Sequence, residues 1–567
     1  MTDVNTLITD HLDIWTTAIE AKSASGRGNS TKISLYGIKK LRELILELAV
    51  RGKLVPQEES EGMAKEILTE VAGIRQQLEA TKSIRKPKSP GPVQRNEMRF
   101  DLAANWVWTR LVELAEIAPK NDANDDGLAS FVPMPEIWTS HTGQHGQEER
   151  SWGEIKKGYT HFANGDIALA KITPCFENSK AAVFSNLKNG IGSGTTELHV
   201  ARLFSDKVIG RFVLLHLKAP SYLENGKPIM TGSAGQKRVP RWYFSDTPIA
   251  LPPTAEQHRI VAKVDELMAL CEALEAQTED SLKAHQTLVE TCLATLTNSQ
   301  SPEELSENWT RIETHFDTLF TTEESIHKLE QSIFELAIQG VLIPQNSDDE
   351  PASVFLRNNG LEVQQIKTPE SLPPGWASCE LGNLGTITGG GTPAKSNKSF
   401  WNGEIPWVSP KDMKVDFVDQ AIDSISEEAI ENSSAKLIKA GSLLFVVRGM
   451  ILAHSFPVAI TKVPVAINQD MKAVDLGDFD RGYVLLMMKA LKPAVLARVE
   501  RSSHGTCKLV SQKLWSIELP IPPKAEQSRI VKRVDELRSL CAGLRSLIKK
   551  SDLDARHIAE AVTKSLI

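Results

Sequence analysis

The sequence contains one helix motif twice, and this duplication limits the folds open to the chain. Residues 251–271 read LPPTAEQHRIVAKVDELMALC and residues 521–541 read IPPKAEQSRIVKRVDELRSLC, with fourteen of 21 positions identical. Residues 38–57, IKKLRELILELAVRGKLVPQ, match residues 326–345, IHKLEQSIFELAIQGVLIPQ, at eleven of 20 positions. Such dense identity without biased composition indicates internal duplication, and two copies favour a pseudo-symmetric molecule over a repeat array.

Each copy is expected to hold a first helix, a linker, a globular domain and a second helix. The copies run from about 1 to 295 and from about 296 to 567. Weaker matches keep the same order: NWVWTRLVELAEI from Asn105 resembles GWASCELGNLGTI from Gly375, and GSAGQKRV from Gly232 resembles SSHGTCKL from Ser502. The first helix of the second copy directly follows the last helix of the first copy. A long helical segment is therefore expected in mid-chain.

The second helix of each copy carries a heptad pattern. Apolar or cysteine residues recur at alternating steps of four and three, at Ile260, Val264, Leu267, Cys271 and Leu274, and at Ile530, Val534, Leu537, Cys541 and Leu544. This spacing predicts a coiled-coil seam in which both cysteines are packing residues and not reactive thiols. Near Ser301, SPEEL supplies a cap, a proline at the first helical position and a glutamate three residues on, which predicts the start of a new helix.

Two segments between the helices have a different character. The segments from about residue 100 to 250 and from about residue 372 to 520 are rich in Gly, Pro and short β-type runs such as GDIALAKI and GSLLFVVRG. They are expected to be compact mixed domains in which strands predominate. The predicted fold class is α+β, with two mixed α/β domains separated by long antiparallel coiled-coil helices in a pseudo-two-fold symmetric tandem duplication.

The expected domain boundaries follow from these patterns. They are an N-terminal helical region and linker at 1–99, a first mixed domain at 100–252, a central helical region at 253–345, a linker at 346–371, a second mixed domain at 372–522 and a C-terminal helix at 523–567.

Composition narrows the class of protein. The net charge of −7 argues mildly against a nucleic-acid binder, although acidic helices can dilute two local basic patches. No uncharged run approaches the roughly 18 residues of a membrane helix, and MTDVNTLITDHLD has acids where a secretion signal has positive charge. The chain is therefore expected in the cytoplasm. Its six cysteines are scattered without C-x-x-C spacing, so neither a structural zinc nor a disulfide is expected.

Motifs for catalysis or cofactor binding are not found. GSGTTE from Gly192 lacks the third glycine of a dinucleotide loop, and GGGTP from Gly389 lacks the Gly-Lys-Ser or Gly-Lys-Thr of a phosphate loop. The double prolines follow Leu or Ile, where DNA amino-methyltransferases carry Asn or Asp before two prolines and an aromatic residue. PKDMK from Pro410 holds an Asp without a matching second acid for a nuclease centre. No catalytic residue, metal or cofactor is predicted in this chain.

The motifs together resemble a known family. PPTAEQHRIVAKVDEL and PPKAEQSRIVKRVDEL, ELAVRGKLVPQ and ELAIQGVLIPQ, GDIALAKITPCFENSKAAVF from Gly165, GGGTPAKSNKSFWNGEIPWVSPKDMK from Gly389 and NQDMKAV from Asn468 resemble the specificity (S) subunits of type I restriction-modification systems. The resemblance covers nearly the whole chain. Family members can be shorter, whereas here about a hundred residues precede the first mixed domain. Because these residues duplicate the central helix, they are interpreted as completing the symmetry.

The resemblance implies a function and a set of partners. Such a subunit is not catalytic itself, and it binds double-stranded DNA at a bipartite site, with one half-site per target recognition domain and a spacer set by the helices. Two methyltransferase (M) subunits, which use S-adenosylmethionine to methylate adenine, and restriction (R) subunits, which use ATP and Mg, are expected to dock on it. Duplicated helices would offer two equivalent docking faces.

Candidate DNA-binding residues are chosen for side chains that suit phosphate or base-edge contacts. In the first domain the basic stretch GKPIMTGSAGQKRVPR is favoured, where Gly235 permits close backbone approach, Gln236 suits adenine and the cations suit phosphate or guanine. The first-domain candidates are Lys171, Thr173, Lys180, Thr195, Thr196, Gly235, Gln236, Lys237, Arg238 and Arg241. A solvated loop is the alternative.

The second-domain candidates are Thr392, Ser409, Lys411, Arg448, Asn468, Gln469, Gly505, Thr506 and Lys508. Because a basic residue recurs at 238 and 508, a shared role in positioning phosphate is favoured over base readout. Asn468 and Gln469 suit adenine, or they satisfy a buried backbone group. Trp401 and Trp407 are expected in the core and not stacked on bases.

Two other functions remain open from sequence. The chain could be a free-standing regulator that binds a bipartite operator, or a methyltransferase or nuclease in its own right. A recognition module needs a methyltransferase polypeptide for tight specific binding, whereas a regulator binds DNA alone and an enzyme turns over substrate unaided.

Overall fold

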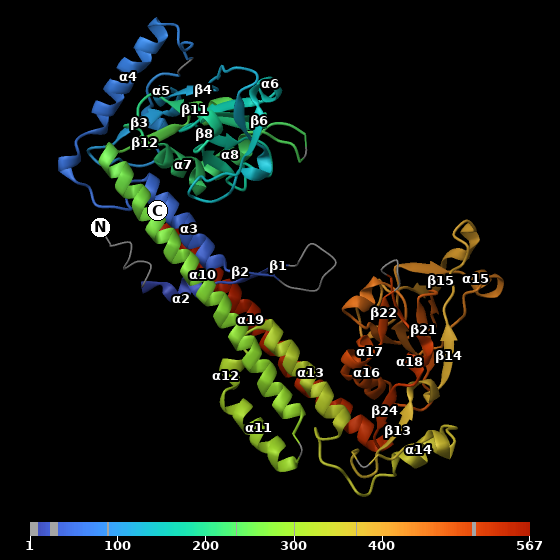
Figure 1. Ribbon diagram of the computed structural model, residues 1–567. Coiled ribbons are helices and arrows are strands. Elements are labelled where there is room, and N and C mark those ends of the chain that lie inside the picture. The colour runs from blue at the N-terminus through green and yellow to red at the C-terminus, as the bar shows by residue number, and fades with distance from the viewer. Residues whose placement is uncertain are drawn as a thin grey trace. The chain divides into compact units, whose positions relative to one another are not determined.

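The computed structural model describes residues 10–22, 32–87, 90–233, 235–299, 301–369, 371–501 and 506–566 (Figure 1). The chain forms two compact units. Unit 1 comprises Met1–Ala21, Ile33–Glu279 and Asp552–Ile567, and unit 2 comprises Lys22–Lys32 and Asp280–Ser551. Each unit therefore contains one copy of the repeat together with the end of the long helix of the other copy. The α+β class and the tandem duplication predicted from the sequence are confirmed, and the pseudo-two-fold relation remains a prediction.

Several helices of unit 1 lie outside its mixed domain. They are α2 (Leu12–Thr17), α3 (Tyr36–Val50), α4 (Ala64–Ala80) and the first part of α10 (Thr254–Thr297). Arg42 pairs with Glu275 at 2.6 Å, and Gln57, beyond the end of α3, donates to Glu256, so α3 and α10 run antiparallel. The first four predicted seam residues of α10 are buried, which confirms the heptad pattern. Burial raises the pKa of the Cys271 thiol to about 11, consistent with a packing residue.

Unit 2 repeats this arrangement. Its helices are α11 (Pro302–Thr314), α12 (Phe316–Leu319), α13 (Glu323–Gln339), α14 (Ala352–Asn358) and most of α19 (Lys524–Leu566). The Ser301 hydroxyl accepts from the Glu304 amide, so the helix start predicted from SPEEL is confirmed. Glu330 of α13 pairs with Arg538 and Arg545 of α19. Ile530, Val534 and Cys541 are buried, as the heptad pattern predicts.

The mixed domain of unit 1 contains two four-stranded sheets. Its strands are β3 (Val107–Arg110), β4 (Ala115–Ile117), β5 (Leu128–Val132), β6 (Glu148–Ser151), β7 (Thr160–Ala163), β8 (Ile167–Ala170), β9 (Ala181–Val183), β10 (Ile191–Gly194), β11 (Leu198–Leu203) and β12 (Pro248–Leu251). Its helices are α5 (Leu111–Leu114), α6 (Trp152–Ile155), α7 (Gly210–Lys218), α8 (Pro220–Gly226) and α9 (Arg241–Asp246). The sheet orders are β6-β5-β10-β7 and β4-β11-β8-β9.

The mixed domain of unit 2 contains a five-stranded and a three-stranded sheet. Its strands are β13 (Ala377–Glu380), β14 (Thr386–Gly389), β15 (Trp401–Val408), β16 (Phe417–Val418), β17 (Asp423–Ile425), β18 (Leu443–Val446), β19 (Val458–Thr461), β20 (Ala466–Ile467), β21 (Met471–Asp475), β22 (Val499–Arg501), β23 (Cys507–Leu509) and β24 (Glu518–Ile521). Its helices are α15 (Glu427–Asn432), α16 (Arg481–Ala490), α17 (Lys492–Leu496) and α18 (Ser511–Trp515). The sheet orders are β14-β21-β18-β19-β16 and β17-β15-β20.

The two domains share a core topology, although β16 of unit 2 and β7 of unit 1 have no counterpart strand among the described residues of the other domain. The order β4-β11-β8-β9 corresponds to β14-β21-β18-β19, and in both domains a short strand, β10 or β20, pairs in parallel with an earlier one, β5 or β15. In each domain the first and last strands pair antiparallel, β3 with β12 and β13 with β24, directly before the double proline and the long helix. Both mixed domains are thus closed at the point where the helix begins.

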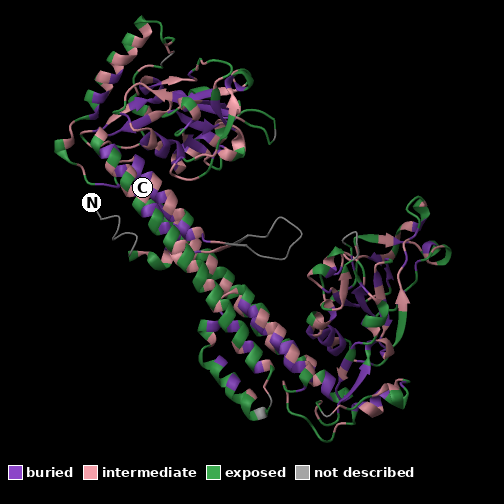
Figure 2. Cartoon of the chain, viewed as in Figure 1, coloured by how far each residue is buried: buried purple, intermediate pink, exposed green. Residues whose placement is uncertain are grey.

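Buried residues concentrate in the strands of each mixed domain, whereas α11 is mostly exposed (Figure 2). Gly192 and Gly194 of the rejected dinucleotide motif lie in β10, where an added Cβ would lie 2.6 Å from the Ser130 carbonyl oxygen and 2.2 Å from that of Val132. These glycines therefore serve close strand packing. Trp407 is buried and Trp401 packs against the same cluster, so the prediction that both belong to the core is confirmed.

Candidate nucleic-acid interface

In unit 1, chain segments converge at one edge of the sheet β4-β11-β8-β9. Lys171 follows β8 and Glu197 precedes β11, and the pairing of Ala170 with Leu198 brings these two segments together. A third segment joins them through isolated bridges from Ile172 and Thr231 to Arg238. We refer to Lys171, Glu197, Lys237, Arg238 and Arg241 as the unit 1 edge.

Arg238 is held against Glu197 by two parallel hydrogen bonds. Its Nε donates to Oε2 at 2.9 Å and its Nη2 donates to Oε1 at 2.8 Å, while Nη1 donates to the Gln236 carbonyl oxygen at 2.9 Å. The hydrogen bonds from Arg238 hold the pKa of Glu197 below its usual range. The carboxylate therefore stays ionised at neutral pH, and the guanidinium plane is fixed.

The unit 1 edge contains three further cations, Lys171, Lys237 and Arg241. Burial lowers the pKa of Lys171 against the attraction of Glu197, and nearby Arg238 and Arg241 lower it further. Lys237 and Arg241 are exposed, the latter at the start of α9. The unit 1 edge thus contains four cations and one carboxylate, so it is positive although the whole chain is acidic.

Other predicted residues of unit 1 have structural partners. The Thr173 hydroxyl accepts from the Lys237 amide at 3.1 Å, and that of Thr195 accepts from the Glu197 amide at 3.2 Å. The Lys180 ammonium donates to the Met134 carbonyl oxygen at 3.0 Å. These three side chains therefore shape the loops of the edge.

The remaining unit 1 candidates lie at the surface. Thr196, Gly235 and Gln236 are exposed. Gly235 has a φ of +78°, a conformation that other residues rarely adopt, so glycine is required by this turn.

Strand ends converge in the same way in unit 2. Gly389 at the end of β14 pairs with Lys472, and Val446 at the end of β18 pairs with Met471, so both strands end beside the start of β21. Val408 at the end of β15 pairs with Ile467. The candidates that follow these strand ends share one edge, namely Thr392, Ser409, Lys411, Arg448, Asn468 and Gln469.

Arg448 and Lys508 supply charge at this edge. An isolated bridge joins the backbones of the two residues. The Nε of Arg448 lies 4.0 Å from Oδ1 of Asp470, and the arginine side chain is 62% exposed. Lys508 is exposed as well. We refer to Arg448, Asp470 and Lys508 as the unit 2 edge.

The other candidates of unit 2 have mixed roles. Thr392 donates to the exposed Gln469, whereas Asn468 is buried and its Oδ1 accepts from the Asp470 amide at 3.0 Å. For Asn468 the alternative of satisfying a backbone group is therefore the one found. The Ser409 hydroxyl donates to Asp412 at 2.8 Å, which explains the lone acid of PKDMK as a loop anchor. Lys411 and Thr506 are exposed, and Gly505 lies outside the described residues.

Backbone hydrogen bonds align the two edges residue by residue. The Lys171 amide donates to the Glu197 carbonyl in unit 1, and the Val447 amide donates to the Asp470 carbonyl in unit 2. The Lys171 carbonyl accepts from Val239 and the Val447 carbonyl accepts from Leu509. Arg238, Glu197 and Ile172 therefore correspond to Lys508, Asp470 and Arg448.

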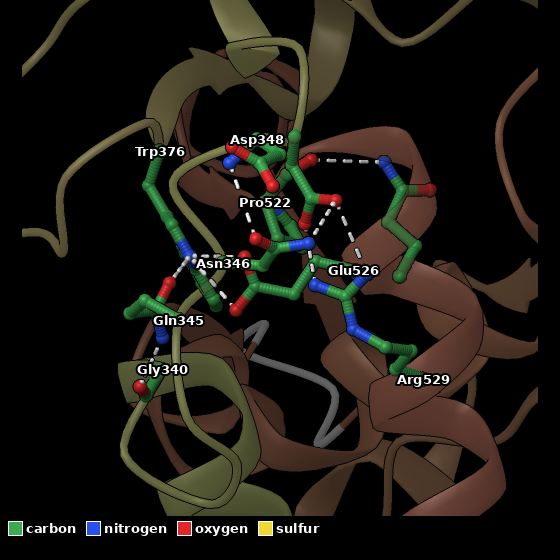
Figure 3. Close-up of polar contacts among 10 residues, drawn as sticks. Gly340, Gln345, Asn346, Asp348, Trp376, Pro522, Glu526 and Arg529 are labelled. Atoms are coloured by element: carbon green, nitrogen blue, oxygen red, sulfur yellow. Dashed lines mark hydrogen bonds and ion pairs between the residues drawn. The ribbon is translucent and has the colours of Figure 1, made fainter.

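A buried carboxylate anchors each mixed domain to its long helix. In unit 1, Glu256 accepts from Trp106 at 3.0 Å, from Gln57 at 2.6 Å and from Asn105 at 3.2 Å. In unit 2, Trp376 donates to both oxygens of Glu526 at 3.2 Å (Figure 3). Burial raises the pKa of both glutamates, against the effect of these hydrogen bonds.

The neighbours of these carboxylates explain the rest of the duplicated motif. Gln257 accepts from the Ile209 amide and donates to the Pro252 carbonyl, and Gln527 accepts from Asp480 and donates to Pro522. Gly340 has a φ of +75°, and an added Cβ would lie 2.9 Å from the Trp376 ring. The Pro-Pro-x-Ala-Glu-Gln and Gly-x-Leu-x-Pro-Gln motifs therefore meet around one tryptophan.

Sequence reasoning missed two features of these sites. It assigned the glutamate of Ala-Glu-Gln only to the helix dipole, although the paired recurrence of Gln57, Trp106 and Glu256 as Gln345, Trp376 and Glu526 was a signal of joint contact. It also omitted Glu197, because this residue lies outside the basic stretch 226–241 and nothing in that stretch indicates an acidic partner.

Clusters of metal ligands and membrane-spanning helices are both absent from the described residues. No group of three or more His, Cys, Asp or Glu side chains is placed to hold a metal ion in that part of the chain. No helix within the same described part has both the length and the apolar character needed to cross a membrane.

Comparisons with known proteins identify the family. Residues 373–550 match the family described as the type I restriction modification DNA specificity domain. The type I restriction enzyme EcoAI and EcoEI specificity subunits, both from Escherichia coli, are each 42% identical to this chain, over the full length of both proteins. A solved chain from a type I R-M system matches with a TM-score of 0.49 and 19% identity, covering 82% of this chain and 98% of that one. With 42% identity to the EcoAI and EcoEI subunits over the full length of both proteins, the chain belongs to the specificity subunits of type I restriction enzymes.

Proposed function

We propose that the chain binds double-stranded DNA at a bipartite sequence, with the mixed domain of each unit contacting one half-site. The observation that carries the proposal is the duplication of the edge itself. Two domains with the same core topology present cations at the equivalent positions 238 and 508, each beside strand ends that suit entry into a groove. Phosphate contacts would position each domain, and side chains that differ between the edges would distinguish the bases.

The duplicated helices are proposed to dock two methyltransferase subunits. Leu270 and Leu540 occupy equivalent positions directly before the seam cysteines, yet they are 52% and 65% exposed. Two equivalent apolar positions on one chain suit two copies of one partner. Restriction subunits are further proposed partners, and S-adenosylmethionine, ATP and Mg are assigned to the partners. The chain itself is proposed to be non-catalytic.

The test is DNA binding by the purified chain with and without its methyltransferase subunit. The site is first identified from the adenines that are methylated in cells expressing both proteins. A duplex carrying this site and a scrambled duplex are then compared at fixed salt, because phosphate contacts make affinity strongly salt-dependent. The proposal expects tight, sequence-dependent binding only in the presence of the methyltransferase subunit.

Other outcomes would point to other functions. Equally tight specific binding by the chain alone would favour a free-standing regulator. Methylation or cleavage of DNA by the chain alone would contradict a non-catalytic role.

A further inference from the structure

Arg238 differs from the other cations of the unit 1 edge because its partner is fixed. Three of its five N–H groups are used, two by Glu197 and one by the Gln236 carbonyl. Since Nη1 and Nη2 each spend one hydrogen, each terminal nitrogen keeps one. The side chain is 40% exposed, so the end of the guanidinium is accessible. One N–H group on each terminal nitrogen of a fixed guanidinium is therefore left for a further acceptor.

The carboxylate behind Arg238 favours a base edge over a phosphate as the acceptor, in contrast to the phosphate-positioning role that the sequence favoured at positions 238 and 508. The ion pair is close to neutral overall, so a phosphate would gain little from Arg238 and would be repelled by Glu197. Guanine N7 and O6 are uncharged acceptors spaced for the two terminal nitrogens of an arginine. Lys237 and Arg241 remain exposed cations beside this pair and suit phosphate contacts.

We propose that Arg238, positioned by Glu197, reads a guanine in the major groove of the half-site that the unit 1 mixed domain contacts. The inference rests on the proposed DNA-binding function and deepens it. Unit 2 places Lys508 where unit 1 has Arg238, and its Asp470 faces Arg448 from 4.0 Å. A lysine is a point charge without the planar fork, so the equivalent position in unit 2 does not read guanine in this way. The two domains therefore read unlike half-sites.

The test uses the full chain in complex with its methyltransferase subunit and duplexes that carry the wild-type site with each base pair substituted in turn. Arg238→Lys keeps the charge but loses the fork. It is expected to reduce discrimination at one G·C pair of one half-site roughly 5- to 150-fold, with the salt dependence and the other half-site unchanged. Glu197→Gln is expected to weaken discrimination at the same pair, because the guanidinium is no longer held in plane.

Arg241→Ala is the matched control on the same edge. It is expected to weaken binding to all duplexes alike and to lower the salt slope by about one, as loss of a phosphate contact does. If Arg238→Lys behaves as wild type, or if Arg238→Ala weakens all duplexes uniformly, the inference is overturned while the bipartite function stands. If the wild-type complex prefers no sequence at all, the proposed function itself fails. In each variant, an unchanged base preference at the half-site contacted by unit 2 serves as the control that the complex is folded.

Discussion

Glu256 and Glu526 sit at the junctions between mixed domains and long helices, and their hydrogen bonds differ in number. Glu256 accepts from three side chains, including Asn105, whereas the residue equivalent to Asn105 is Gly375, which has no side-chain donor. Besides Trp376, only Gln345 among the described residues lowers the pKa of Glu526 by hydrogen bonding. The Gln345 amide also donates to the Gly340 carbonyl at 2.7 Å, so Glu526 depends more heavily on Trp376. A buried carboxylate that loses its donor bears the full cost of its desolvation.

This difference predicts unequal effects of one substitution at equivalent positions. Trp376→Phe is expected to lower the free energy of unfolding of unit 2 by about 1–3 kcal/mol beyond the packing loss. Trp106→Phe removes the same volume and leaves Glu256 two donors, so its effect on unit 1 should be smaller. Hydrogen exchange, measured at increasing urea concentration, gives a separate unfolding midpoint for each unit and provides the measurement. An equal or larger loss from Trp106→Phe would contradict the assignment.

Lys218 provides a pH-dependent prediction. It is buried in unit 1, its Nζ donates to the Ser179 carbonyl at 2.6 Å, and burial lowers its pKa to about 7. From pH 7 up to its ordinary pKa of about 10.4, the unfolded chain holds a proton that the folded chain lacks. The free energy of unfolding should therefore rise with pH in this window, with a contribution approaching about 1.4 kcal/mol per pH unit.

Lys218→Met removes the titrating group and should remove that contribution. Denaturant unfolding of wild type and variant between pH 6 and 10 measures the difference. Identical pH slopes for the two proteins would show that Lys218 keeps its ordinary pKa in the folded state.

At the scale of elements, periodicity and capping predicted the helices well. The seam of α10, the start of α11 and the repeated first helices lie where the sequence places them, because local hydrogen bonding and heptad spacing are encoded locally. The edges could not be predicted in the same way. Arg238 and Glu197 are 41 residues apart, and only strand order brings them together. The buried role of Asn468 likewise depends on the turn before β21.

The helix α10 gives a prediction at this scale. This helix begins in unit 1 and ends in unit 2, and the boundary between the two units follows Glu279. Inserting seven residues after Glu279 preserves the heptad seam and lengthens the helix by about 10 Å, the rise of about three base pairs. The preferred DNA spacer should lengthen by a similar amount while both half-site sequences stay the same.

Methylation mapping of the insertion variant measures this. A seven-residue insertion after Asn298, between α10 and α11, adds chain without lengthening the helix and should leave the spacer unchanged. A change in half-site bases, or an equal spacer change in both variants, would contradict a helical spacer.

At the scale of the whole molecule, the central claim is that each mixed domain contacts one half of a bipartite site. The strand pairs offer clean boundaries for testing it. Val107 pairs with Leu251 and Ala377 pairs with Ile521, and the two spans so closed are equal in length. Either span can therefore replace the other, with both junctions in the paired strands. The tryptophan and glutamate that anchor the domain to the long helix lie outside the exchanged spans and are present in both units.

The most direct measurement is a genome-wide map of methylated adenines, made by single-molecule sequencing of cells that express the chain with its methyltransferase subunit. Wild type is compared with a chain in which residues 377–521 also replace residues 107–251. The account predicts a bipartite site for wild type, and for the exchanged chain a site whose two halves are the same sequence in inverted orientation. Retention of both wild-type half-sites by the exchanged chain would contradict it.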